Sequence, residues 1–177
     1  MRKRSLAFFL AAAVLFGVGA CGCSSSSSAS PSTTSTTSTT GAPVSSDDPG
    51  QWLSGQAGRW NAALNADQNS VSAAASATSG VSNSTYFSQL ADACTKMLHD
   101  AEKARTIPAA PVSTLQDAWN GMLAATETYA DYCLQVAHSQ STADLAAWKN
   151  SLKSMNSANR KWNVEVSKVQ NAAASSG

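Results

Sequence analysis

The sequence predicts an all-α fold, an antiparallel up-down four-helix bundle with one interhelical disulfide. Four segments within residues 47–171 repeat apolar residues at spacings of three and four, the pattern of one buried helix face. The connections between these segments are short, which favours antiparallel neighbours in up-down-up-down order. No segment alternates apolar and polar residues as a half-buried strand would.

Residues 1–20 have the layout of a secretory signal peptide. Three cationic residues follow Met1, and an uncharged, mostly apolar run extends from Leu6 to Ala20. This run has about 15 residues, whereas a helix that crosses a bilayer needs about 20. We therefore expect an export signal rather than a permanent transmembrane anchor.

The end of this signal, Val-Gly-Ala-Cys at 18–21, resembles the lipobox of bacterial lipoproteins. In a lipobox, small residues precede a cysteine that receives diacylglycerol and becomes the mature N-terminus. The resemblance implies lipidation of Cys21 and a location on the outer face of the cytoplasmic membrane, where two acyl chains give stable anchoring. The alternative is an ordinary signal cleaved near Ala20, which leaves a free thiol. Cys23 receives no role.

Residues 21–46 form the lipidated N-terminus and its tether. From Ser24 to Ser46 nearly every residue is Ser, Thr, Pro, Ala or Gly, so the segment has too little apolar surface to offset the entropy of folding. We expect a disordered linker with a reach of about 27 Å. The tract resembles the glycosylatable linkers of actinobacterial lipoproteins, although a plain spacer is the simpler interpretation.

The charge of the mature chain argues against nucleic acid as a partner. Loss of residues 1–20 removes three of the 12 Lys and Arg residues, so nine remain against 11 Asp and Glu, a net charge of −2. No polybasic stretch survives to contact phosphates. Residues 47–171 suit one small domain, and residues 172–177 are expected to be a disordered tail.

The first predicted helix follows Asp48 and Pro49, a favourable N-cap residue and a proline suited to the first turn, and ends near Ala75. Its apolar stripe is Leu53, Ala57, Trp60, Leu64 and Val71. The second helix begins after residues 80–84 and ends before Ile107. Its stripe is Phe87, Leu90, Cys94, Met97 and Ala101.

The third predicted helix opens at Ser113, with Gln116 three residues later in a capping-box pattern. Its stripe is Leu115, Trp119, Met122, Thr126, Tyr129, Cys133 and Val136. The fourth helix begins near Ser141 or Thr142. Its stripe is Leu145, Trp148, Leu152, Met155, Asn159, Trp162, Val166 and Val169, and such a seven-residue repeat predicts helices packed along their lengths.

Cys94 and Cys133 lie on the core stripes of consecutive helices, and an exported domain meets oxidising conditions, so we expect a disulfide. A simple hairpin would leave the two thiols about 14 Å apart in height. The connection 106–112 contains two prolines and spans up to about 23 Å, which lets the third helix begin beyond the end of the second. The alternative is two separate buried thiols.

Each distinctive core residue has both a packing and a binding interpretation. Large apolar residues at helical spacing more often form a core than contact a ligand, and this applies to Trp60, Trp119, Trp148 and Trp162. On the same stripe, Asn159 either fixes the register as a buried polar residue or faces a small wet cavity. Alanine and serine beside these rings either allow close helix packing or leave room for a guest.

The sequence carries no recognisable catalytic or metal chemistry. Inward-facing Glu-x-x-His pairs of a diiron bundle and a Cys-x-x-Cys-His haem motif are both missing. His99 and His138 lie on different predicted helices without a second ligand at helical spacing. We therefore expect no catalytic residue, no metal and no cofactor.

The fourth helix has an excess of cations, which are Lys149, Lys153, Arg160, Lys161 and Lys168. Against Asp144 and Glu165 they give this helix a net charge of +3. The simpler interpretation is a solvated face. The functional interpretation is attraction to anionic lipid head groups or to an acidic partner.

The lipobox, the Ser/Thr tether, Cys94, the Ile107-Pro108 turn, Trp119 and Cys133 together resemble small helical lipoproteins of actinobacteria. The resemblance implies an exported, anchored and helical protein, and it implies no activity. We expect a non-enzymatic helical module that binds another envelope component through its outer surface. The alternative is a carrier that holds an apolar small molecule or lipid between the helices, and an enzyme ranks third.

Overall fold

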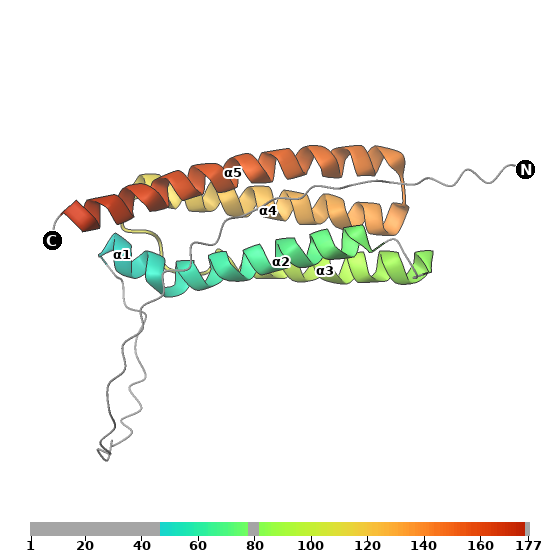
Figure 1. The fold of residues 1–177 in the computed structure, drawn as a ribbon, viewed down its shortest axis with the longest axis horizontal. Coiled ribbons are helices and arrows are strands. Elements are labelled where there is room, and N and C mark those ends of the chain that lie inside the picture. The colour runs from blue at the N-terminus through green and yellow to red at the C-terminus, as the bar shows by residue number, and fades with distance from the viewer. Residues whose placement is uncertain (1–46, 78–81, 176–177) are drawn as a thin grey trace, which may run out of the picture. The chain divides into compact units, whose positions relative to one another are not determined.

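The computed structural model describes residues 47–77 and 82–175, and every regular element in these ranges is helical. The first rod of the bundle combines α1 (Pro49–Trp52), the π-helical turn η1 (Leu53–Ala57) and α2 (Gly58–Ser76). The other three rods are α3 (Asn83–Ala104), α4 (Ser113–Ser139) and α5 (Thr142–Ser175). The predicted antiparallel four-helix bundle is confirmed (Figure 1).

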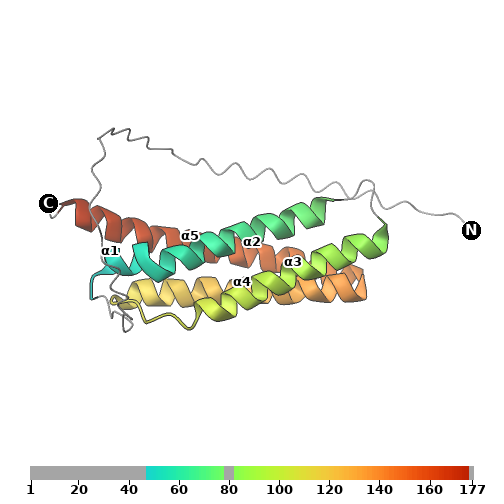
Figure 2. The ribbon, with the colours of Figure 1, turned by 90° about the horizontal axis from the view of Figure 1, so that it is seen from below.

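The four rods do not contact one another equally. The central rod, α4, packs along both α3 and α5, and α2 packs along α3. The backbone of the first rod approaches α5 mainly through α1, so this last seam of the bundle is wider than the others (Figures 1 and 2). The axes of helices that meet through side chains of ordinary size lie about 8–10 Å apart, so a wider seam must be filled by large side chains.

The first rod starts as predicted and then shifts its buried stripe by one residue. The Asp48 carboxylate accepts a hydrogen bond from the Gly50 amide at 2.7 Å, and a proline occupies the first turn. Trp52 is buried, at 6 % exposure, whereas Leu53 is only half-buried. Leu53, the first residue of the predicted stripe, therefore packs at the edge of the core, and the buried residue at this end is Trp52.

The π-helical turn explains this shift. A π turn closes its hydrogen bond over five residues instead of four and so inserts one extra residue into the rod. Within it, Gly55 has the non-helical angles φ −85° and ψ −120°. The extra residue places Trp52 on the same face as Ala57, five positions later. Gly58 closes the turn, and a Cβ there would lie 2.4 Å from the Leu53 carbonyl oxygen.

The disulfide between Cys94 and Cys133 is present, with a Cα–Cα distance of 6.1 Å. Both residues are fully buried between α3 and α4. The connection after α3 runs along the bundle before α4 begins, so that α4 starts beyond the end of α3 (Figure 2). This stagger brings the two cysteines level, as the two prolines of the connection predicted.

The predicted capping box at the start of α4 is wrong. Val112 occupies the N-cap position, and no side chain caps the helix there. Gln116 instead accepts a hydrogen bond from the Ala110 amide and donates one to Asn120 at 2.9 Å. The extended connection lies beside the first turn, so its amide takes the oxygen that a capping box would direct to the helix start.

The other end of α4 and the end of α5 follow from local chemistry. Gln140 has a φ of 53° and ends α4 in the left-handed conformation, and Ser141 accepts a hydrogen bond from Ala143 as α5 begins. The helix α5 continues to Ser175 and so passes residue 171, where the predicted domain ended. Three alanines at 172–174 explain the extension, because alanine has the highest helix propensity.

The core consists of two clusters. One surrounds the disulfide and is mostly aliphatic, with Tyr129 and Trp148 at its α5 side. The other contains three tryptophans beside Leu115 and Leu123. Buried residues of α4 belong to both clusters, as expected for the rod that packs against two neighbours.

Candidate functional site

Three tryptophans from different rods form a cluster at the wide seam. The ring centroids of Trp52 in α1 and Trp119 in α4 are 5.8 Å apart, and those of Trp119 and Trp162 in α5 are 5.0 Å apart. The Trp52 indole also donates a hydrogen bond to the Pro108 carbonyl at 2.8 Å. We call Trp52, Trp119 and Trp162 the Trp cluster. Its members pack against one another, which supports the core interpretation.

The remaining candidate core residues divide between the interior and the surface. Trp148 is buried with its ring 5.7 Å from that of Tyr129, whose pKa burial raises to about 12. Trp60 is half-buried at the edge of the Trp cluster. Asn159 is half-buried rather than enclosed, so it does not act as a fully buried register residue.

An uncharged groove of about 350 Å³ opens where the π turn faces α5. The buried ring of Trp162 contributes to its lining, and the polar groups present are amides and a hydroxyl. The lining residues are Gly50, Leu53, Ser54, Gly58, Asn61, Trp162, Asn163, Val166, Val169, Gln170 and Ala173. A surface of this kind suits an apolar ligand better than an ionic one.

The predicted basic residues of α5 share one face. All five are exposed, and at about 100° per residue they fall within a sector of about 120°, centred opposite the core residues Trp148, Met155 and Trp162. Val164 lies in the middle of this sector and is 53 % exposed. We call the sector the cationic face, formed by Lys149, Lys153, Arg160, Lys161, Lys168 and Val164.

One of these cations has an acidic neighbour on its own helix. The Lys168 ammonium donates to Glu165 at 2.6 Å, and this hydrogen bond lowers the pKa of the Glu165 carboxyl. Outside α5 the described chain holds four cations and nine carboxylates, a net charge of −5 against +3 on α5. The domain is thus electrically divided, with α5 as its positive side.

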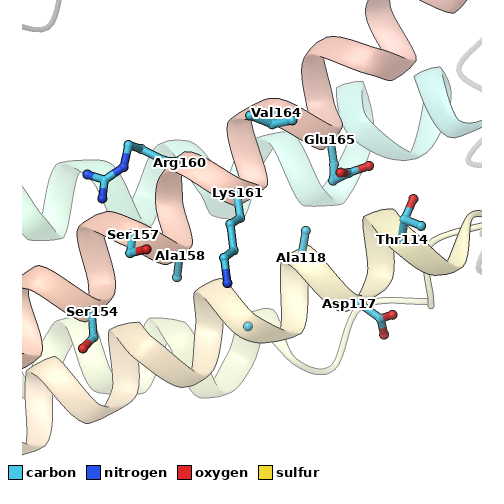
Figure 3. A pocket seen from close by; sticks show the side chains of 11 residues that line it. Thr114, Asp117, Ala118, Ser154, Ser157, Ala158, Arg160, Lys161, Val164 and Glu165 are labelled. Atoms are coloured by element: carbon cyan, nitrogen blue, oxygen red, sulfur yellow. The ribbon is translucent and has the colours of Figure 1, made fainter.

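A second groove, of about 790 Å³, runs between α4 and α5 (Figure 3). Its floor is made of small residues, and its rims carry charge from both helices. It is lined by Thr114, Asp117, Ala118, Gly121, Ser154, Ser157, Ala158, Arg160, Lys161, Val164 and Glu165. This α4–α5 groove joins the cationic face, because Arg160, Lys161 and Val164 belong to both.

Sequence reasoning found the α5 rim of this groove and missed its α4 side. Charged residues at helical spacing produce a visible pattern, whereas Ala118 and Gly121 produce none. The one available signal was Gly121 itself, since a glycine inside a helix costs about 0.5–1 kcal/mol relative to alanine.

A buried acidic residue was also missed. The side chain of Asp67 in α2 is 3 % exposed, and its carboxylate accepts a hydrogen bond from Lys96 of α3 at 2.6 Å. Lys96 also donates to Asp100 at 2.7 Å. Burial raises the pKa of Asp67. Burial acts in the same direction at Asp100, but the hydrogen bond and charge of Lys96 prevail and lower the pKa of that carboxyl. The spacing of Asp67 between Leu64 and Val71 was the signal for its burial.

Three further observations concern metal sites, membrane spans and the predicted lipidation site. They contain no cluster of three His, Cys, Asp or Glu side chains able to hold a metal ion. In the same ranges, no helix is long and apolar enough to cross a membrane. The predicted lipidation site, Cys21, lies outside the described residues, as do the whole signal segment and tether of residues 1–46.

Comparisons with protein-family models, with curated proteins and with solved structures found no match to this chain. The function therefore has to be argued from the two grooves, the cationic face and the sequence that precedes the bundle.

Proposed function

We propose that the protein is a lipid-anchored module on the outer face of the cytoplasmic membrane, and that it binds another envelope component without catalysis. The observation that carries the proposal is the cationic face of α5. Five exposed cations lie opposite the core on one helix, while the rest of the described domain has a net charge of −5. A charge distribution with one positive side attracts an acidic partner and orients it toward that side.

The anchor rests on the resemblance of residues 18–21 to a lipobox and on the polar tract that follows. We propose that this tract serves as the tether expected from its composition, which for about 25 residues has a reach of about 27 Å. Such a reach suits a module that works by docking.

Two ion pairs of the described chain join neighbouring helices, and the proposal gives them a structural role. Lys96 links α2 to α3 through Asp67, and Arg105 at the end of α3 donates to Glu127 of α4 at 2.7 Å. These charged groups hold helices together, as structural ion pairs do. We assign none of them the role of a general acid or base.

The anchor is tested by substitution of Cys21 in the full chain, expressed in its own host. Cys21→Ser removes the thiol that would carry the lipid, so we expect the protein to leave the membrane fraction or to accumulate as an uncut precursor. Fractionation and intact mass measure this result, with Cys23→Ser as the matched control. A processed, membrane-bound Cys21→Ser protein contradicts the anchor.

The binding function is tested by charge reversal on the cationic face. The triple variant Lys153→Glu, Arg160→Glu, Lys161→Glu is compared with wild type on native gels of detergent-solubilised envelopes. We expect at least about a tenfold loss of any complex that contains the protein, since several charge contacts reverse sign. Asp92→Lys, at an exposed position on α3, is the control. A complex that survives the triple variant refutes a role for this face.

A second candidate, a carrier of an apolar small molecule or lipid, is favoured by the uncharged groove beside Trp162. This groove lies at the surface seam between α1 and α5 rather than deep in the bundle core. Native mass spectrometry of the protein from its own host tests the carrier directly. A retained lipid that is lost on substitution of Val166 by Glu supports it, and an empty domain opposes it.

A further inference from the structure

We propose that the α4–α5 groove is the docking site for an acidic helical segment of another envelope protein. This inference rests on the proposed function and specifies the partner of its cationic face. A long hollow between two antiparallel helices has the shape to receive a third helix, and a floor of small residues lets the backbones approach closely. Figure 3 shows Ala118 on α4 and Ala158 on α5 beside this hollow.

Gly121 supplies a separate argument for a close external approach. It lies within α4 and is exposed, and a Cβ built there would meet no atom within 4 Å. Packing inside the described domain therefore does not require glycine, although glycine costs about 0.5–1 kcal/mol of helix stability at such a position. A partner backbone seated on the groove floor accounts for the missing side chain.

The two rims of the groove differ in charge: the α5 rim carries Arg160 and Lys161, and the α4 rim carries Asp117. Lys161 extends from α5 across the groove toward α4, and Arg160 points away from α4 on the other side of the helix (Figure 3). Glu165 is engaged by Lys168 at 2.6 Å, which leaves the α5 rim positive. A docked helix with Asp or Glu facing Lys161 is thus favoured, and a basic helix is repelled.

The groove favours a helix over an anionic bilayer. A flat lipid surface touches the protruding cations but cannot enter the hollow between α4 and α5. It also brings lipid phosphates toward Asp117, which lines the same groove. An acidic helix avoids this carboxylate by placing a small or amide residue against it. Exposed Val164 offers such a helix an apolar contact at the rim.

Site-specific photocrosslinking in the full, membrane-associated chain tests the proposal. The photoreactive residue p-benzoylphenylalanine replaces Val164 in the groove or, as a control, exposed Thr95 on α3. We expect an adduct from position 164 with one envelope protein, mapped by peptide mass spectrometry to a helical segment rich in Asp and Glu. Position 95 should give none of this adduct.

Two substitutions then probe the groove itself. Lys161→Glu reverses the charge that faces the partner, and Gly121→Leu blocks the floor while its Cβ enters open space. Each should lower the adduct yield at least about tenfold. Gly121→Leu and Lys161→Glu should both retain the helicity and thermal unfolding of wild type or exceed them, which separates loss of docking from loss of folding.

The outcomes divide cleanly. An acidic-segment adduct that is sensitive to both substitutions supports the proposal. Adducts with phospholipid only, adducts with a second copy of this chain, or a yield indifferent to Lys161→Glu and Gly121→Leu overturn it. If the native-gel complex still depends on the cationic face while position 164 gives no such adduct, the proposed function stands and this groove is not its docking site. If no complex exists, both proposals fail.

Discussion

Two seams of the bundle are built in different ways. The α3–α4 seam is closed by a covalent bond between buried cysteines and by mostly aliphatic packing around them. The seam between the first rod and α5 is wider, and it is filled by the Trp cluster at the end where α1 lies. One seam thus contains a disulfide, and the other is filled by three tryptophan rings that pack against one another.

This difference concerns function as well as stability. The Trp-filled seam carries the uncharged groove at the π turn. A π turn is costly in a helix and often occurs near functional sites. Here it has a packing role, because it turns Trp52 toward the other two rings.

The largest predicted effect is that of removing the disulfide between α3 and α4. The double variant Cys94→Ala, Cys133→Ala opens a loop with a sequence separation of 39 and should lower the free energy of unfolding by about 4 kcal/mol. Urea unfolding measures the change, and wild type in reductant is the matched control. A loss below about 1 kcal/mol would show that helix packing alone holds this seam.

A smaller effect is expected at the Trp-filled seam. Trp52→Phe keeps an aromatic ring but removes the indole donor to the Pro108 carbonyl and part of the buried volume, so stability should fall by about 1–2 kcal/mol. Trp60 is half-buried and serves as the control: Trp60→Phe should lower the free energy of unfolding by less than Trp52→Phe does. If both variants unfold alike, Trp52 has no special role in joining α1 to the bundle.

The smallest effect concerns the α2–α3 contact and depends on pH. The pKa of Asp67 is raised in the folded state, so its contribution to stability is fully present below the unfolded pKa of 3.8 and is lost as the pH rises through the folded pKa. Asp67→Asn mimics the protonated group. It should therefore affect the free energy of unfolding more favourably at pH 7 than below pH 3.8, where wild-type Asp67 is itself protonated.

Asp100 provides the control of opposite sign. Its pKa is lowered, so its stabilising contribution is present above pH 3.8 and is lost as the pH falls through the folded pKa. Asp100→Asn should therefore destabilise the domain at pH 7 and have little effect in acid. Thermal unfolding across pH 3–8 measures both variants. The effect of Asp67→Asn should become more favourable as the pH rises and that of Asp100→Asn less favourable, and the same trend for both would contradict the directions of the two pKa shifts.

The four helices and the disulfide were predictable because their signals are local. Apolar spacing reports which face of a helix is buried, and Asp48-Pro49 reports where the first helix begins. Even the stagger that aligns Cys94 with Cys133 followed from two prolines in the connection, since proline restricts its own residue and the one before it. The cations of α5 were equally visible, because charges at helical spacing mark one face.

Only the tertiary structure decided the features that depend on neighbours in space. With the π turn in place, the Trp52 ring lies 5.8 Å from that of Trp119 and 6.2 Å from that of Trp162, and no spacing within the first rod records these distances. The α4–α5 groove arises where small residues of two helices coincide, and small residues leave no periodic signal. The local pattern of a chain indicates which residues prefer burial. The distances between helices in the folded bundle determine which side chains fill the space between them and where grooves remain.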